Sequence, residues 1–425
     1  MESQFWNTGR MADYQLRKIK RLVNHAYENV PYYSRLFRKE RIHPDDINTF
    51  HDFQQLPVLT KEIARRENHN LISQPLENSK VKRTKTGGTT GPPLAVVSDA
   101  ASRSFVWGSY YRWYRWMNIN ERDPVAIVWG TNRVLSKKHL SDFKHFLIDF
   151  IQNNLTFNAF NINPLEIRSI VNKLNSFRPK LIRGYLSALL QIAESIQEQH
   201  LSLSFTPMAV STTTETLLPN HRKYLVDTFK SAVFDQYGCG EVEGIAYECA
   251  CHEGLHVTNE HVFLEILDDN HNQVLDGQGR IVVTDLDNFA MPFIRYENGD
   301  LSSLSLEKCR CGVAHPKLMG VDGRMSDTII LKNGNSVHGV FFTDIFHEVG
   351  ITSAVMNRFQ VYQRIPGKIE LRLEKTRSIE KSKHELLRKA LERFFSHVEV
   401  TYHEKIPSEK NGKFRYIISD MIDSN

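Results

Sequence analysis

The chain has 425 residues, with 54 lysines and arginines against 49 aspartates and glutamates, 41% hydrophobic residues and 24% charged ones. This composition is typical of a globular protein and excludes a disordered chain, a fibre or a bundle of membrane spans. The formal net charge of +5 is small, and basic residues are mixed with acidic ones along the chain, so nucleic acid is not an expected partner. At roughly 150 residues per domain, the length predicts two or three domains.

The location is predicted from the cysteines and the N-terminus. Five cysteines are too few for the disulfide framework of a secreted protein. Residues 1–20 carry charges and amides where a signal peptide needs an apolar core. The apolar stretch 181–193 contains Arg183 and is shorter than the roughly 20 residues that cross a bilayer. We therefore expect a cytoplasmic protein without a membrane span.

The first part of the chain predicts helices followed by alternating strands and helices. Apolar residues recur at helical spacing from Tyr14 to Glu28, and Pro31 ends this pattern because proline lacks a backbone donor. We expect residues 1–80 to form a helical cap. From about Val81 the alternation predicts an α/β domain with mixed rather than purely parallel sheets. The expected strands cover residues 94–97, 125–129, 181–182, 208–211, 232–234, 262–267 and 281–284.

Beyond about Gly323 the pattern is compact and self-contained. Alternating apolar residues on both sides of Pro366-Gly367 predict a hairpin. Residues 381–395 have the pattern of an amphipathic helix, and alternation in residues 398–402 predicts a further strand. The predicted fold class is therefore α/β and α+β, with a large multi-sheet domain and a small α+β domain. The predicted domains are residues 1–324 and 325–425.

Residues 84–93, Thr-Lys-Thr-Gly-Gly-Thr-Thr-Gly-Pro-Pro, concentrate glycines and hydroxyls. Small residues let backbone N–H groups approach an anion and the hydroxyls add donors, so the segment suits a triphosphate. It is not a Walker A loop, because no Gly-Lys-Ser/Thr follows. The alternative is a flexible turn leading into a strand.

Three other segments place polar side chains at turns. Glu241 follows a predicted strand, where it can hold Mg²⁺ against phosphate oxygens, and Tyr237 before it can stack on a base. Asp300, on a loop after a strand, can accept both ribose hydroxyls. Lys413 follows a glycine on a polar loop. The alternatives are a solvated glutamate, an ordinary Asn-Gly-Asp turn and an exposed lysine.

Four of the five cysteines form two Cys-x-Cys pairs, Cys249 with Cys251 and Cys309 with Cys311. Such a pair is poorly shaped for an internal disulfide, but two thiolates on one turn can bind a tetrahedral metal that a second pair completes. The alternative is a group of buried reduced thiols. Cys239 is interpreted as a space-filling residue, because no partner base is visible in the sequence.

The order of these motifs resembles the adenylate-forming superfamily, which includes acyl-CoA synthetases, firefly luciferase and the adenylation domains of peptide synthetases. The series is the glycine and hydroxyl loop, Tyr-Gly-x-x-Glu, Arg-Tyr-x-x-Gly-Asp, Gly-Arg-x-x-Asp and a late Gly-Lys. Residues 29–33, 56–61 and 359–363 make the chain more similar to the phenylacetate-CoA ligase family and its capsular-polysaccharide-biosynthesis branch. The resemblance covers nearly the whole chain.

The resemblance implies that ATP and Mg²⁺ activate a small-molecule carboxylate as an acyl-adenylate, with release of pyrophosphate, before acyl transfer to CoA or an amine. It also implies that the small C-terminal domain is mobile, with Asp327 as its hinge. Lys413 and Glu241 would be catalytic, the latter through Mg²⁺. The implied ATP-binding residues are Thr86, Gly87, Gly88, Thr89, Thr90, Gly91, Tyr237, Gly238, Asp300 and Arg324.

Two residues depart from the family pattern. Pro92 stands where lysine is frequent, and Gly240 stands where threonine usually precedes the glutamate. Both changes weaken side-chain contacts to phosphate, which motivates the alternative of a non-catalytic nucleotide-binding relative in polysaccharide biosynthesis. Retention of Glu241, Asp300 and Lys413 favours the enzyme. A zinc-containing nucleic-acid binder has little support from the charge.

The resemblance further implies a structural Zn²⁺ held by Cys249, His256, Cys309 and Cys311, with Cys251 competing for one position. Four protein ligands would close the site. The pocket for the carboxylate substrate is predicted to be lined by Trp129, Tyr185 and residues 211–214. We expect a monomer or homodimer.

Overall fold

The computed structural model describes residues 2–76, 81–85, 94–129, 147–159, 162, 166–274, 276–324, 329–333, 336–337, 339–351, 356–375, 381–407 and 414–419. Two compact units are present. The first unit contains Met1–Glu121 and Phe234–Val321, and the second contains Arg122–Val233 and Asp322–Asn425. The predicted domain boundary between residues 324 and 325 stays a prediction.

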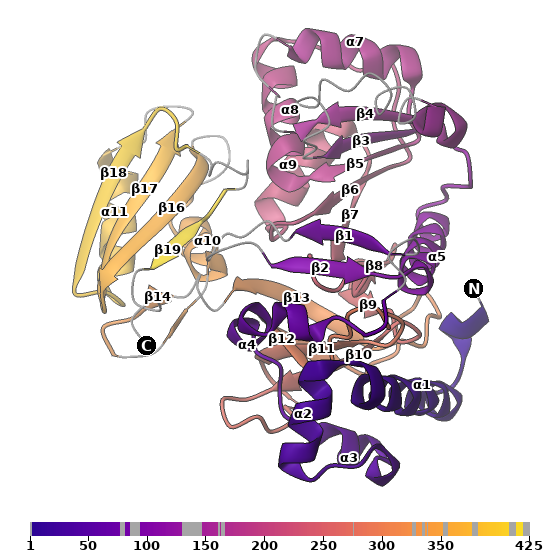
Figure 1. The fold of residues 1–425 in the computed structure, drawn as a ribbon. Coiled ribbons are helices and arrows are strands. Elements are labelled where there is room, and N and C mark those ends of the chain that lie inside the picture. The colour runs from indigo at the N-terminus through magenta and orange to yellow at the C-terminus, as the bar shows by residue number, and fades with distance from the viewer. Residues whose placement is uncertain are drawn as a thin grey trace. The chain divides into compact units, whose positions relative to one another are not determined.

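The first unit begins with the predicted N-terminal helices, α1 (Thr8–Asn29), α2 (Pro31–Glu40), α3 (Phe50–Gln54) and α4 (Lys61–Arg66). The side chain of Asn7 caps α1 by accepting from the Arg10 N–H, and Pro31 opens α2, where its missing donor costs nothing. The buried residues of α1 recur every three or four positions and so form a single apolar face. This face packs with α2 against the sheet of the first unit (Figure 1).

That sheet has the strand order β10-β11-β12-β13-β9-β8-β7 within the first unit. The strands are β7 (Ala232–Tyr237), β8 (Ala246–Glu248), β9 (Leu255–Val257), β10 (Val262–Leu267), β11 (Gly279–Asp285), β12 (Tyr296–Ser305) and β13 (Lys317–Arg324). The pairs of β10 with β11, β11 with β12, β9 with β13, β8 with β9 and β7 with β8 are antiparallel. The first unit also contains the hairpin of β1 (Lys82–Lys85) and β2 (Ala95–Ser98) and the helix α5 (Ala100–Trp116). Three short 3-10 helices, Glu2–Phe5, Pro44–Asp46 and Asn68–Leu71, belong to it as well.

The second unit begins with parallel strands in the order β6-β5-β3-β4. These are β3 (Val125–Trp129), β4 (Asn154–Asn158), β5 (Leu181–Tyr185) and β6 (Ala209–Thr213). The helices α7 (Ile167–Phe177), α8 (Leu186–Glu198) and α9 (Pro219–Phe229) bury their apolar side chains with Ala126, Val128, Ile182 and Val210 of the strands. These four residues lie on one face, because alternate residues of a strand point the same way.

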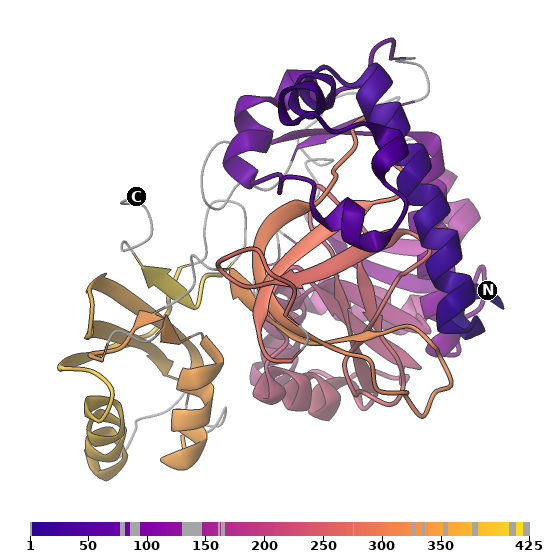
Figure 2. The same ribbon diagram turned by 90° about the horizontal axis from the view of Figure 1, so that it is seen from below.

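The C-terminal part of the second unit contains β14 (Ile329–Ile330), β15 (Ser336–Val337), α10 (Gly339–Glu348), β16 (Met356–Ile365), β17 (Lys368–Lys375), α11 (Lys381–Glu392), β18 (His397–His403) and β19 (Ile417–Ser419). The order of its four-stranded sheet is β18-β17-β16-β19. Phe359 and Val361 pair with Leu373 and Leu371 across the predicted hairpin. These residues are buried together with α10 and α11, which cover one face of the sheet (Figure 2).

The fold class and the predicted strands are confirmed. The seven predicted strands all occur, and most extend one to three residues beyond the apolar run that predicted them. The mixed pairing also agrees, since antiparallel strands dominate the first unit and parallel strands form the sheet of β3 to β6. In the part of the chain that the structure describes, no helix is long and apolar enough to cross a membrane.

Candidate nucleotide and metal sites

Glu241 lies in the turn between β7 and β8 and is held by a hydrogen bond. The hydroxyl of Tyr296 donates to Glu241 Oε1 at 3.0 Å. Burial raises the pKa of Tyr296, and the Glu241 carboxylate raises it further, so the phenol stays a neutral donor. The interpretation of Glu241 as a solvated residue is wrong, because only 6% of it is exposed.

Asp300 lies within β12, in a local irregularity of the strand. Val282 pairs with Glu297, but Arg280 pairs with Leu301, so residues 298–300 lie opposite a single residue of β11. This bulge needs Gly299, whose φ of +87° is unfavourable for residues with a Cβ. The prediction of a loop after the strand is therefore corrected to a bulge inside the strand.

The bulge brings Asp300 to Tyr237, which lies 63 residues earlier in the chain. The Tyr237 hydroxyl donates to Asp300 Oδ2 at 2.7 Å and accepts from Asn298 Nδ2 at 2.5 Å. The deep position of the phenol and the nearby Asp300 carboxylate raise the pKa of Tyr237. Strands β7 and β12 thus place an aromatic ring and a carboxylate together, and their adenine and ribose roles stay predictions.

Cys239 carries a thiol that is close enough to Glu241 and Asp300 to be affected by both carboxylates. Burial raises the pKa of its thiol, and Glu241 and Asp300 both add to the shift. The protonated thiol contacts the backbone of Val242. A group that resists ionisation in this way is a poor nucleophile, which agrees with the space-filling role.

Other predicted site residues fall outside the described part of the chain. These are Thr86, Gly87, Gly88, Thr89, Thr90, Gly91, Asp327 and Lys413. Gly238 is described and follows β7 directly. Arg324 ends β13, but its side chain also lies outside the described part.

Two residues predicted for the carboxylate pocket meet in the second unit. The rings of Trp129 and Tyr185 have centroids 4.8 Å apart, at the carboxyl ends of β3 and β5. Tyr185 pairs with Thr213 at the end of β6. Carboxyl ends of parallel strands are the usual ligand-binding edge of a sheet, which supports the predicted location.

Four metal-ligating side chains converge in the first unit. Cys249 follows β8, His256 belongs to β9, and Cys309 and Cys311 lie between β12 and β13. Their ligand atoms all lie within 4.8 Å of one another, and this cluster does not include Cys251. Cys249 Sγ and Cys309 Sγ are 3.7 Å apart. A tetrahedral zinc with Zn–S bonds of about 2.3 Å separates two thiolates by about 3.8 Å, so the residues fit this metal.

The protonation of this cluster also suits a metal. Burial lowers the pKa of His256 to about 4, so its imidazole is neutral at pH 7. His256 Nδ1 lies 3.2 Å from the carbonyl oxygen of His315, to which it can donate, and Nε2 faces Cys311 Sγ at 3.2 Å. A backbone acceptor on one ring nitrogen leaves the lone pair of the other for a metal.

Burial raises the pKa of Cys249 and Cys311, whereas that of Cys309 is lowered. Burial opposes ionisation of Cys309 as well, but the Cys311 N–H and the neighbouring thiols donate to its sulfur. These donors shift the pKa of Cys309 in the direction that a zinc-bound thiolate requires. All five cysteines are free of disulfides.

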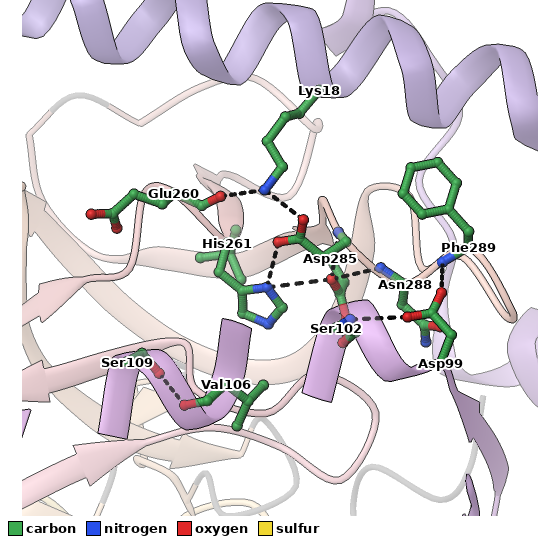
Figure 3. A network of polar contacts seen from close by, with 12 residues as sticks. Lys18, Asp99, Ser102, Val106, Ser109, Glu260, His261, Asp285, Asn288 and Phe289 are labelled. Carbon is green, nitrogen blue, oxygen red and sulfur yellow. Dashed lines mark hydrogen bonds and ion pairs between the residues drawn. The ribbon is translucent and has the colours of Figure 1, made fainter. Parts of the chain in front are cut away.

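A second polar cluster lies where α1 meets the end of β11 (Figure 3). Lys18 Nζ is 2.6 Å from Asp287 Oδ1, and His261 Nδ1 is 2.9 Å from Asp287 Oδ2. Asp285 accepts from the Ser102 hydroxyl and from two backbone N–H groups. Each carboxylate oxygen already has a donor, and the Lys18 ammonium supplies the positive charge. We therefore interpret this cluster as a charge network that ties α1 and α5 to β11, which the sequence reasoning missed.

Comparison with known sequences identifies relatives over most of the chain. Residues 329–420 match the family model described as the CapK C-terminal domain. Protein CapK of Staphylococcus aureus is 24% identical over 422 residues, which cover 96% of this chain and 89% of CapK. The phenylacetate-coenzyme A ligase of Thermus thermophilus is 24% identical and covers 84% of this chain and 79% of its own length. The enzyme of that name from Escherichia coli is 25% identical, with coverages of 76% and 72%.

Solved structures show the same fold. The 2-hydroxyisobutyryl-CoA ligase in the postadenylation state, in complex with R3-HIB-AMP, has a TM-score of 0.81 at 17% identity. This match covers 99% of this chain and 92% of that one. The amide bond synthetase McbA from Marinactinospora thermotolerans has a TM-score of 0.53 at 15% identity and covers 77% and 66%. The chain is therefore similar, over most of its length, to CapK and to the phenylacetate-coenzyme A ligases, and it shares the fold of 2-hydroxyisobutyryl-CoA ligase.

Proposed function

We propose that this protein is an ATP-dependent ligase that activates a carboxylate as an acyl-adenylate, releases pyrophosphate and transfers the acyl group to CoA. The observation that carries the proposal is the convergence of Tyr237, Glu241 and Asp300. They come from two strands and a turn of the first unit, and each polar group is fixed by a hydrogen bond. The fold is shared with ligases whose structures contain acyl-AMP.

In this proposal each carboxylate has a separate task. Glu241 offers the hard oxygen ligand that Mg²⁺ prefers, and Mg²⁺ bound there would offset the charge of the phosphates. Tyr296 orients Glu241, and the buried position of the carboxylate strengthens its field. Asp300 would accept the ribose hydroxyls, with Arg324 nearby and the ring of Tyr237 beside the base.

Residues outside the described part would supply the remaining positive charge and hydrogen-bond donors. Lys413 would approach the α-phosphate and the carboxylate, where two anions must be brought together. The segment 86–91 would bind the other phosphates, mainly through backbone N–H groups because Pro92 and Gly240 have no polar side chain. Residues 325–425 would move as a domain about Asp327.

CoA is the favoured acyl acceptor, because several relatives are named as CoA ligases. The amide bond synthetase with the same fold keeps an amine acceptor as the second candidate. The resemblance to the capsular-polysaccharide-biosynthesis branch motivates a proposed role in polysaccharide biosynthesis, and the similarity to CapK covers most of both chains. The cytoplasm is the proposed location, since it supplies ATP and CoA and keeps the free cysteines reduced.

We also propose that Cys249, His256, Cys309 and Cys311 hold a structural Zn²⁺. Four protein ligands leave no open position for substrate, so the metal would supply stability rather than chemistry. It would join the segment after Glu241 to the segment after Asp300. The zinc would thereby hold together the two parts of the chain that carry the nucleotide-binding carboxylates.

The proposal is tested by carboxylate-dependent exchange of labelled pyrophosphate into ATP, measured across a panel of aromatic, aliphatic and amino acids. An active ligase shows exchange with at least one acid, and CoA or an amine then yields the thioester or amide. A non-catalytic relative binds ATP without exchange. Glu241→Gln should abolish exchange while the protein remains folded.

A further inference from the structure

Asn298, Tyr237 and Asp300 form a closed ring of hydrogen bonds. Asn298 Oδ1 accepts from the backbone N–H of Asp300 at 3.1 Å, and Asn298 Nδ2 donates to the Tyr237 hydroxyl. The same hydroxyl donates to Asp300 Oδ2. Asn298 is only 4% exposed, so both ends of its amide are committed to this ring.

The chemistry of the amide fixes the direction of every bond in the ring. A backbone N–H can only donate, so the amide end that faces Asp300 must be the oxygen. The other end is then the NH₂ group, which can only donate to Tyr237. A phenol has one proton, and since its oxygen already accepts from Asn298, that proton is directed to Asp300.

We propose that Asn298 is a positioning residue for ribose recognition, an inference that rests on the proposed role of Asp300. By directing the Tyr237 proton to Oδ2, it fixes the plane of the Asp300 carboxylate. The acceptor lone pairs then meet the ribose hydroxyls in one orientation. Asn298 thereby contributes to the preference for ribonucleotides over deoxynucleotides without touching the nucleotide.

The primary test measures kcat/KM for ATP, 2′-deoxyATP and 3′-deoxyATP by pyrophosphate exchange. Asn298→Ala should lower the ratio of ATP to deoxyATP about fivefold to tenfold, as expected for the loss of a neutral hydrogen bond in a buried site. The effect should appear in kcat/KM, with kcat at saturating ATP nearly unchanged. Asp268→Ala is the matched control, because Asp268 closes a similar side-chain-to-backbone turn at Asn270 on the surface of the same unit. It should leave the ratio unchanged.

Asp300→Ala separates this inference from the function on which it rests. If Asp300→Ala removes the discrimination and Asn298→Ala does not change it, the positioning role is wrong and the ribose role stands. If Asp300→Ala keeps the discrimination, the ribose role itself is wrong, and the inference falls with it. Weakened discrimination between ATP and deoxyATP in both variants supports the inference.

A second set of variants distinguishes positioning from a purely structural effect. Asn298→Asp keeps the acceptor for the Asp300 N–H but loses the donor to Tyr237, and its new carboxylate competes for the phenol proton. It should therefore reduce discrimination at least as much as Asn298→Ala. In a Tyr237→Phe background, Asn298→Ala should cause no further loss of discrimination between ATP and deoxyATP, because the hydroxyl that Asn298 directs is absent. Equal losses in both backgrounds would overturn the proposal, even if the thermal stability of the variants differs.

Discussion

Replacement of Cys249 by serine is the sharpest test of the predicted zinc site. The sulfur of Cys249 is buried and lies at the separation from Cys309 that a tetrahedral zinc requires. A hydroxyl is a weak zinc ligand, so Cys249→Ser leaves three strong ligands. Because changes to outer-shell partners alone cost about 10- to 100-fold in affinity, loss of a direct ligand should cost at least about 100-fold.

This loss of affinity should appear as a loss of stability, because zinc binding favours the folded state. A 100-fold change corresponds to about 3 kcal/mol in the free energy of unfolding. For a unit of roughly 200 residues, this lowers Tm by about 6–12 °C. The assay is zinc content by elemental analysis of the purified protein together with thermal melting. The wild-type protein should contain one equivalent.

Cys251→Ser is the matched control, since Cys251 lies next in sequence to the site but outside the cluster. It should keep the zinc and the Tm, whereas Cys249→Ser should lose both. Less than about half an equivalent in the wild-type protein would refute the zinc. Zinc retained by Cys249→Ser and lost by Cys251→Ser would refute the ligand set.

Three further predictions concern catalysis and stability. Lys413→Ala should abolish pyrophosphate exchange but leave ATP binding, measured by calorimetry, largely intact; undiminished exchange would remove Lys413 from catalysis. Burial alone would raise the pKa of Glu260. The Arg112 guanidinium, with Nη1 at 2.5 Å from Glu260 Oε1, opposes this effect, and the pKa falls from 4.5 to about 2. A lowered carboxyl pKa stabilises the fold above pH 4.5, and this contribution, up to about 3 kcal/mol, is lost as the pH falls toward 2. Urea unfolding should therefore show a shallower pH dependence in Glu260→Gln over that range, and parallel curves would contradict the pairing. Gly299→Ala should lower the free energy of unfolding by about 1–2 kcal/mol, because φ is +87° while no atom lies within 4 Å of the added Cβ. An unchanged urea midpoint would show that the bulge tolerates a side chain.

The elements of the fold could be predicted because their signals are local. The short apolar runs 262–267 and 281–284 predicted β10 and β11, and the alternation around Pro366-Gly367 predicted the hairpin of β16 and β17. The candidate carboxylates could be named for a similar reason, since Glu241 and Asp300 each follow a short glycine-containing pattern.

The environment of those carboxylates could not be predicted from local patterns. The bulge at 298–300 depends on the register of β11 against β12, and the Tyr296 bond to Glu241 joins residues 55 apart. The Lys18 network joins α1 to the end of β11 through residues with no sequence motif in common. Such contacts depend on tertiary packing, which a single sequence does not display.

The measurement that tests the proposed function most directly is carboxylate-dependent exchange of labelled pyrophosphate into ATP by the full chain, with Glu241→Gln alongside. The proposed ligase activity predicts exchange with at least one carboxylic acid, its loss in Glu241→Gln, and an acyl-CoA product when CoA is added. ATP binding without exchange for any acid in the panel would contradict it.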